Sequence, residues 1–163
     1  MRIRKATVDD IPLIRQLTSQ VWPQTYIPII GEEQVNYMLE MMYSEESLTA
    51  QMKEGNEFII VYDGEDPVGF ASFGLISPDT YKLHKLYVLT SMQGKGAGRY
   101  MIGEIIQKLI ERNARQLLLN VNRNNPAKKF YEKLGFTVIK EEDIAIGNGY
   151  FMNDYVMSIS LIN

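Results

Sequence analysis

The spacing of apolar positions divides the chain into helical and extended stretches. Residues 1–6 alternate apolar and basic side chains, which is typical of a short strand. The segment Thr7-Val8-Asp9-Asp10 then matches a capping box, and a helix is predicted from there to about Val21 because apolar residues recur at helical spacing. The next segment, residues 23–31, contains two prolines and a glycine. We therefore expect it to end this helix as a loop.

The same criteria predict the remaining elements. Helices are expected at 32–43, 44–53 and 100–112, with a short one after Asn124-Asn125-Pro126, and strands at 57–63, 68–76, 83–89, 115–121, 136–146 and 150–161. Gly147-Asn148-Gly149 is expected to join the last two strands as a tight turn. This order predicts a mixed α/β sheet with flanking helices.

A glycine-rich turn, Gln93-Gly94-Lys95-Gly96-Ala97-Gly98-Arg99, separates the 83–89 strand from the helix that follows. Glycines let a backbone approach a ligand closely, and the first amides of a helix suit a phosphate group. The dinucleotide-binding motif is excluded because its third glycine comes one residue early and positions 117–119 are all leucine. The P-loop is excluded because Gly96, and not serine or threonine, follows the lysine.

The turn fits another pattern. Gln-x-x-Gly-x-Gly after a strand that ends in Leu-Tyr-Val resembles the acetyl-CoA pyrophosphate loop of the GNAT superfamily of N-acetyltransferases. Residues 124–136, Asn-Asn-Pro-Ala-Lys-Lys-Phe-Tyr-Glu-Lys-Leu-Gly-Phe, are similar to a second motif of that family and follow in the family's order. The close match covers residues 81–136, and the order of elements extends it to nearly the whole chain.

The resemblance implies a GNAT-like α/β fold over residues 1–163 as a single domain. Its sheet would have about seven mostly antiparallel strands, with acetyl-CoA between a splayed fourth and fifth strand. Backbone groups of the fourth strand would pair with the pantetheine arm and polarise the thioester carbonyl, and the glycine-rich turn would hold the pyrophosphate. The implied cofactor-binding residues are Leu86, Tyr87, Val88, Gln93, Gly94, Lys95, Gly96, Ala97, Gly98, Arg99 and Asn124.

Two side chains are candidates for catalysis. Tyr131 matches the family's general-acid tyrosine, and a phenol with a pKa of about 10 is able to protonate a departing thiolate. Spacing alone favours a core tyrosine on an amphipathic helix, whereas the motif match favours the acid. His84 is the single histidine and is predicted on the fourth strand, where it could take a proton from the acceptor ammonium directly or through water. The alternative for His84 is a structural role.

Trp22 and Tyr26 are candidates for the wall of an acceptor-amine pocket. The segment between the first two helices usually forms one side of that pocket in the family. An aromatic wall could also hold a protonated amine by cation–π contact. The alternative is an apolar loop that packs on the core.

Composition narrows the chemistry. The net charge of −3 gives no indication of nucleic-acid binding. The absence of cysteine excludes disulfides, thiolate metal sites and an acetyl-cysteine intermediate, and one histidine excludes a multi-histidine metal site. Direct attack of the amine in a ternary complex is therefore expected. No signal-peptide core and no run of 18 apolar residues occur, so a cytoplasmic location without a membrane segment is expected.

The sequence thus predicts an acetyl-CoA-dependent N-acetyltransferase that acts on a primary amine of a small molecule, with the bacterial polyamine or small-amine type as the subgroup that it resembles. Two alternatives remain: a protein N-terminal or lysine acetyltransferase, and a non-catalytic acyl-CoA-binding module. No metal is expected. Homodimers are common in the family, often through the last strands, but the sequence alone does not establish one here.

Overall fold

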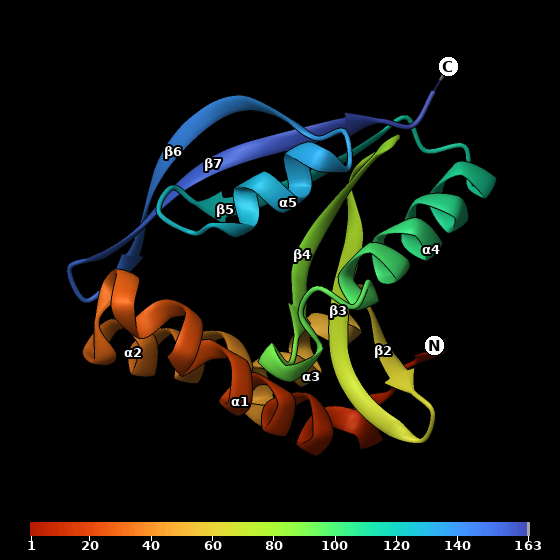
Figure 1. Cartoon of the computed structure of the whole chain (residues 1–163). Helices are drawn as coiled ribbons and strands as arrows, with labels where there is room; N and C mark the ends of the chain where they lie inside the picture. The colour runs from red at the N-terminus through yellow and green to blue at the C-terminus, as the bar shows by residue number, and fades with distance from the viewer. Residues whose placement is uncertain (163) are drawn as a thin grey trace.

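One sheet of seven strands, in the order β1-β2-β3-β4-β5-β7-β6, forms the centre of the computed structural model, which describes residues 1–162 (Figure 1). The strands are β1 Arg2–Lys5, β2 Glu57–Asp63, β3 Asp66–Ser77, β4 Thr80–Val88, β5 Gln116–Asn122, β6 Thr137–Gly147 and β7 Tyr150–Ser160. The helices are α1 Ile11–Ile30, α2 Glu32–Tyr43, α3 Glu45–Lys53, α4 Ala97–Glu111 and α5 Ala127–Lys133, with short 3₁₀ turns η1 Val8–Asp10 and η2 Thr90–Met92. The predicted mixed α/β architecture is confirmed.

The β4–β5 pair is where the sheet opens. Every other neighbouring pair is antiparallel, whereas β4 and β5 are parallel and pair only from Thr80–Leu83 to Gln116–Leu119. Beyond these residues the two strands diverge, as Figure 1 shows. The expected splay of the fourth and fifth strands is therefore confirmed, and it leaves the second half of β4 without a hydrogen-bonded strand on its β5 side within residues 1–162.

Two apolar clusters hold helices on opposite faces of the sheet. Helix α4 buries Met101, Ile105 and Leu109 in the same cluster as Leu117 of β5. On the other face, α1, α2 and α3 pack in a second cluster that also contains alternate residues of β2, together with Phe70 of β3. This alternation follows from the period of two along a strand, and it places α4 and α5 on one side of the splay and α1 on the other.

Helix α1 corrects the expected loop at residues 23–31. It continues for 20 residues through Pro23 and Pro28 and ends at Gly31, whose φ of +85° suits glycine. An interior proline removes one helical hydrogen bond at a cost of about 3 kcal/mol, but burial of Trp22, Tyr26 and Ile30 in the second cluster offsets this cost. Although α1 is long, no helix within residues 1–162 is long and apolar enough to cross a membrane.

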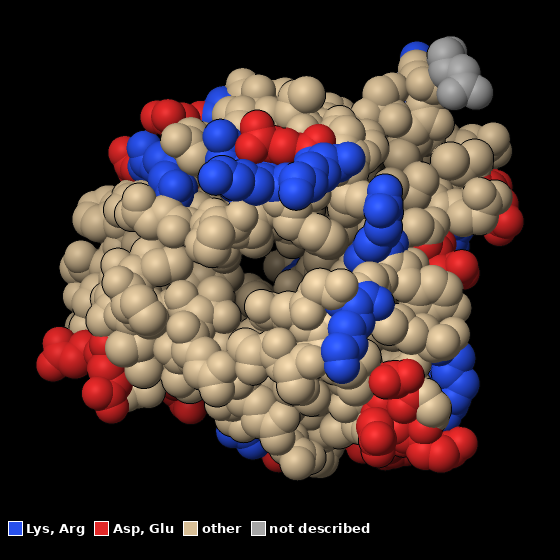
Figure 2. All heavy atoms as spheres, viewed as in Figure 1, with Lys and Arg blue, Asp and Glu red and all other residues tan. Residues whose placement is uncertain are grey.

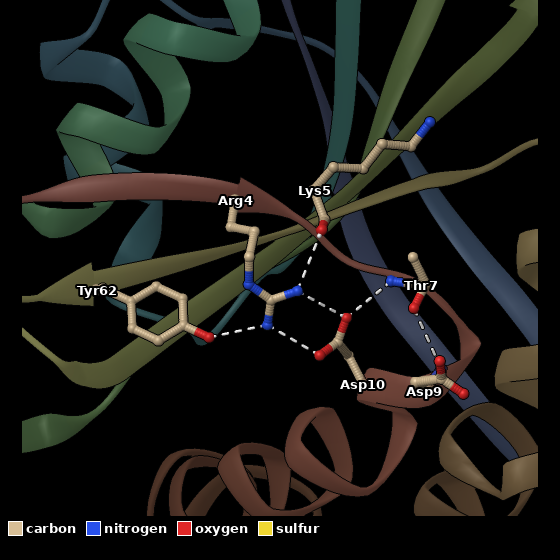
Figure 3. A network of polar contacts seen from close by, with 6 residues as sticks. All are labelled: Arg4, Lys5, Thr7, Asp9, Asp10 and Tyr62. Atoms are coloured by element: carbon tan, nitrogen blue, oxygen red, sulfur yellow. Dashed lines mark hydrogen bonds and ion pairs between the residues drawn. The ribbon is translucent and has the colours of Figure 1, made fainter.

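The predicted capping box holds the start of the helical region against the sheet (Figure 3). The Asp10 carboxylate accepts from the Thr7 amide at 2.8 Å, and the Thr7 hydroxyl accepts from the Asp9 amide at 3.3 Å. Arg4 of β1 also donates to both carboxylate oxygens of Asp10 at 2.8 and 2.9 Å, and to the Tyr62 hydroxyl at 2.9 Å. The Arg4 guanidinium thereby lowers the pKa of Asp10 below its usual value.

Substitution of Asp10→Ala should lower the free energy of unfolding by about 1 kcal/mol at pH 7, because the cap and the Arg4 pair are lost together. Since the folded-state pKa of Asp10 is depressed, its contribution should be complete above about pH 5 and shrink as the pH falls below about 4. Urea unfolding of the wild type and the variant at both ends of this pH range measures the difference in the free energy of unfolding. Asp9→Ala is the matched control, because the Asp9 carboxylate takes no part in the network; an equal loss in both variants would contradict the assignment.

Candidate active site

A cavity of about 860 Å³ lies where β4 and β5 diverge. Its walls come from β4, the end of β5, the turn before α4, helix α5 and one face of α1. Figure 2 shows a hollow in this face of the molecule between α1 and α5, with basic side chains near its rim. The splay thus gives access to the middle of the sheet, where a strand edge is exposed.

The glycine-rich turn brings backbone amides to one end of the cavity. Gly94 and Gly96 have φ values of +82° and +87°, which side-chain-bearing residues rarely adopt. The first helical hydrogen bond of this turn runs from the Tyr100 amide to the Gly96 carbonyl, at 2.9 Å. The amides of Ala97, Gly98 and Arg99 therefore precede the regular ladder of α4 and are oriented to bind an anion.

Gly98 has a packing role as well. A Cβ atom at this position would lie 3.1 Å from Cζ of Phe130 on α5. The alternate glycines thus serve different purposes, two for backbone conformation and one for close contact with α5.

Gln93 and Lys95, which were predicted to bind the cofactor, use their backbone amides within the turn itself. The Lys95 amide donates to the Met92 carbonyl at 3.2 Å, and Lys95 is not among the residues that line the cavity. The Gln93 amide donates to the Thr90 carbonyl at 3.3 Å, and its side chain donates to the Val88 carbonyl at 3.4 Å. Both amides therefore close the turn, which leaves the later ones for a ligand.

The open edge of β4 forms the long wall of the cavity. Leu86, Tyr87 and Val88 all line it, and their strand has no β5 partner at this point. Unpaired N–H and C=O groups of an edge strand are able to pair with an extended ligand. Together with the α4 amides and Arg99, this edge fits a molecule that has an amide-containing arm at one end and a pyrophosphate at the other.

Tyr131 of α5 lines the cavity opposite this edge. It is only 8% exposed, and its ring contacts those of Phe130 and Phe136 at centroid distances of 5.2 and 5.8 Å. Burial raises the pKa of the Tyr131 phenol, so the group stays protonated and is able to donate its proton. Spacing favoured a core tyrosine and the motif match favoured a site tyrosine; in the structure, Tyr131 is buried and also lines the cavity.

Asn124 and Asn125 share the turn before α5, and both line the cavity. The Asn125 side chain accepts from the Ala127 amide at 2.9 Å, so it is the one that caps the helix. Its Nδ2 also lies 3.4 Å from the Tyr26 hydroxyl. Asn124 is exposed, and only its amide is engaged, by the Asn122 side chain at 2.9 Å.

The aromatic pair predicted for the acceptor wall is divided between two environments. Tyr26 lines the cavity, and its hydroxyl lies 3.1 Å from that of Tyr87, which joins α1 to β4. Trp22, in contrast, is 2% exposed and lies behind Tyr26 at a centroid distance of 4.4 Å, outside the cavity lining. The reason is the helical continuation of α1, which turns Trp22 into the apolar cluster.

His84 lines the cavity from β4, where the β3 register skips from Lys85 to Leu83. This bulge makes His84 the extra residue of the strand and exposes its imidazole to the cavity. The surrounding protein, and secondly the ammonium groups of Lys82 and Lys85, lower the pKa of His84 to about 4. The ring is therefore neutral at physiological pH and able to accept a proton, which it would hold weakly.

Lys85 and Asn120 are among the polar residues of the cavity that sequence reasoning missed. The Asn120 side chain donates to the Asp154 carboxylate of β7 at 3.2 Å, and burial raises the pKa of that acid. No motif singles out either residue. Among residues 1–162, no group of three or more His, Asp or Glu side chains is arranged to hold a metal ion.

Comparison with known families agrees with this geometry. The acetyltransferase (GNAT) domain model matches residues 27–158. The chain belongs to the GNAT family. It is 26% identical over 149 residues to the uncharacterised N-acetyltransferase YuaI of Bacillus subtilis, covering 88% of this chain and 84% of that protein. It is also 24% identical over 144 residues to the spermidine N(1)-acetyltransferase of Thermoplasma acidophilum, covering 85% and 89%.

The crystal structure of a PaiA N-acetyltransferase from Thermoplasma acidophilum in complex with coenzyme A has the same fold, with a TM-score of 0.81 over 98% of each chain at 22% identity. This GNAT protein is accordingly an N-acetyltransferase with acetyl-CoA as donor. The unpaired edge of β4 and the amides of α4 fit that donor.

Proposed function

We propose that this protein transfers the acetyl group of acetyl-CoA to a primary amine of a small molecule, polyamine-like or other, by direct attack in a ternary complex. One observation carries this proposal: the open β4 edge, the amides of the glycine-rich turn and Tyr131 all line the same cavity. Acetyl-CoA supplies a thioester in this site. With no cysteine in the chain, an acetylated thiol has no place in the reaction.

Each wall has a task in this proposal. The α4 amides and Arg99 bind the pyrophosphate, and the backbone of residues 86–88 aligns the pantetheine arm and polarises the carbonyl. The protonated Tyr131 donates to the leaving thiolate, which is a weaker base than a phenolate. Asn124 contacts the donor from the α5 side.

A small acceptor is supported by how the cavity is enclosed. Tyr26 links α1 to Tyr87 on β4 and to Asn125 before α5, so that the α1 side of the cavity is spanned by side chains. Further along, Tyr37 and Gln34 of α2 donate to the carbonyls of Ile146 and Phe151 at 2.6 and 2.8 Å. These contacts join the helical layer to the β6–β7 hairpin. A protein acceptor would need an open groove at this place.

His84 is proposed to accept the amine proton, directly or through water. Substitution of His84→Gln should lower kcat/KM by about 10²-fold, the lower end of the range for acid–base catalysis, because its weakly basic ring gives little driving force. Since its pKa is about 4, the loss should be constant from about pH 6 to pH 9. Steady-state rates of the wild type and the variant across this pH range measure the loss of kcat/KM. A wild-type inflection near pH 6.5 that disappears in the variant would contradict the lowered pKa.

The proposed function is tested by release of the CoA thiol from acetyl-CoA against polyamines, amino acids, aminoglycosides and short peptides. Turnover with one class of small amine is the expected result. Turnover only with peptides would favour a protein N-terminal or lysine acetyltransferase. Tight acetyl-CoA binding without turnover of any amine would favour a binding module of the same fold.

A further inference from the structure

Lys85 is a buried cation in the wall of the cavity. It lies on β4 directly opposite Ser72 of β3, is 8% exposed and lines the cavity. Its Nζ lies 4.5 Å from the centroid of the Tyr43 ring. Burial lowers the pKa of Lys85 to about 8, so the ammonium form still predominates at neutral pH.

No protein group neutralises this charge. Within residues 1–162, no carboxylate lies within 4 Å of Lys85, and the buried acid Asp154 is hydrogen-bonded to Asn120. Ser72 Oγ, opposite Lys85 in the β3–β4 register, and Trp22 Nε1, in the same apolar cluster as Tyr43, are both buried and without hydrogen-bond partners. Buried lysines are almost always paired, and a cation–π contact alone compensates poorly for lost hydration. The missing anion is therefore expected to come from a ligand.

The donor's pyrophosphate is not placed to be that anion. The glycine-rich turn leads into α4, which packs in the cluster on one face of the sheet. Lys85 contacts Tyr43, which belongs to the cluster on the opposite face, with α1, α2 and α3. The charge thus lies on the side of β4 that faces away from the pyrophosphate loop, in the part of the cavity left for the acceptor.

We propose that Lys85 binds a carboxylate of the acceptor, so that the acceptor is a short molecule of the amino-acid class with both a primary amine and a carboxylate. This inference rests on the proposed small-amine activity and narrows it. An ammonium donates charge-assisted hydrogen bonds to a carboxylate, whereas the second ammonium of a diamine would be repelled. Polyamines are then the poorer acceptors, although one relative is a spermidine N(1)-acetyltransferase.

The test compares short ω-amino acids with alkylamines and diamines of the same chain length, using CoA thiol release by the full chain. At the chain length that fits, the wild type should show a kcat/KM for the amino acid about tenfold or more above that for the alkylamine. Lys85→Met should reduce this ratio to near one because the rate with the amino acid falls most, while Lys85→Arg should retain part of the preference. Lys82→Met is the matched control on the same strand, outside the cavity lining, and should keep the preference.

A second measurement is independent of turnover. Calorimetry of the N-acetylated amino acids and the matched N-alkylacetamides with the CoA complex should show tighter binding of the acids in the wild type only. If no amine is acetylated, the proposed function fails, and this binding preference alone then decides the role of Lys85. The inference is overturned if diamines or alkylamines are preferred at every length, or if Lys85→Met slows all amines equally, as loss of a general base would.

Discussion

Replacement of Tyr131→Phe should lower kcat by about 10²–10⁴-fold while the affinity for acetyl-CoA stays nearly unchanged. The change removes one hydroxyl and keeps the ring, which packs between Phe130 and Phe136. Since burial keeps this phenol protonated, the substitution deletes the proton donor without unfolding α5. CoA thiol release measures kcat, and calorimetry measures the affinity.

Tyr62→Phe is the matched control for this prediction. Its hydroxyl contacts Arg4 on β1, and Tyr62 does not line the cavity. The control should lose little activity, although it loses the same atom from the same residue type. Wild-type turnover in the Tyr131 variant would remove Tyr131 from the acid role and leave it as a core residue.

The second large effect is expected at the glycine-rich turn. Gly96→Val should abolish detectable acetyl-CoA binding, because the residue adopts a φ of +87° that a β-branched side chain rarely tolerates. An added Cβ at Gly96 meets no protein atom within 4 Å. The valine would therefore project into open space, and because Gly96 lines the cavity, we expect it to block the approach of the pyrophosphate. Calorimetry with CoA measures the loss, and cooperative thermal unfolding checks that the variant is folded.

Gly103→Ala provides the corresponding control, because Gly103 lies in the interior of α4 and an added Cβ there also meets no atom within 4 Å. Alanine in a helix interior is favourable by about 1 kcal/mol, so this variant should bind CoA normally and be slightly more stable. Normal CoA binding by Gly96→Val would show that the turn does not hold the pyrophosphate.

Most elements could be predicted because their signals are local. The alternation in β6 and β7, the cap at Thr7 and the Gly147-Asn148-Gly149 turn each depend on neighbours in sequence, and the structure contains all three. The turn at 93–99 was also found by its spacing, since its backbone conformation requires glycine at Gly94 and Gly96. Such features depend on backbone conformation, which a few adjacent residues decide.

The length of α1 could not be predicted. Pro23 and Pro28 weaken a helix locally, but the segment gains more from burying Trp22 and Tyr26 against β4 and α2 than it loses in hydrogen bonds. The same continuation separates the two aromatic residues, with Tyr26 at the cavity and Trp22 behind it. Propensity favoured a loop, and tertiary packing overrode it.

The sequence by itself determined the order of elements, the family and the glycine-rich turn, because each depends on residue types at short spacing. Only the tertiary structure decided which side chains share the cavity. The bulge at His84 shifts the register of β4, and the parting of β4 from β5 opens the cavity that Lys85 and Asn120 line. The cavity arises from contacts between segments far apart in sequence, so no local pattern shows which side chains line it.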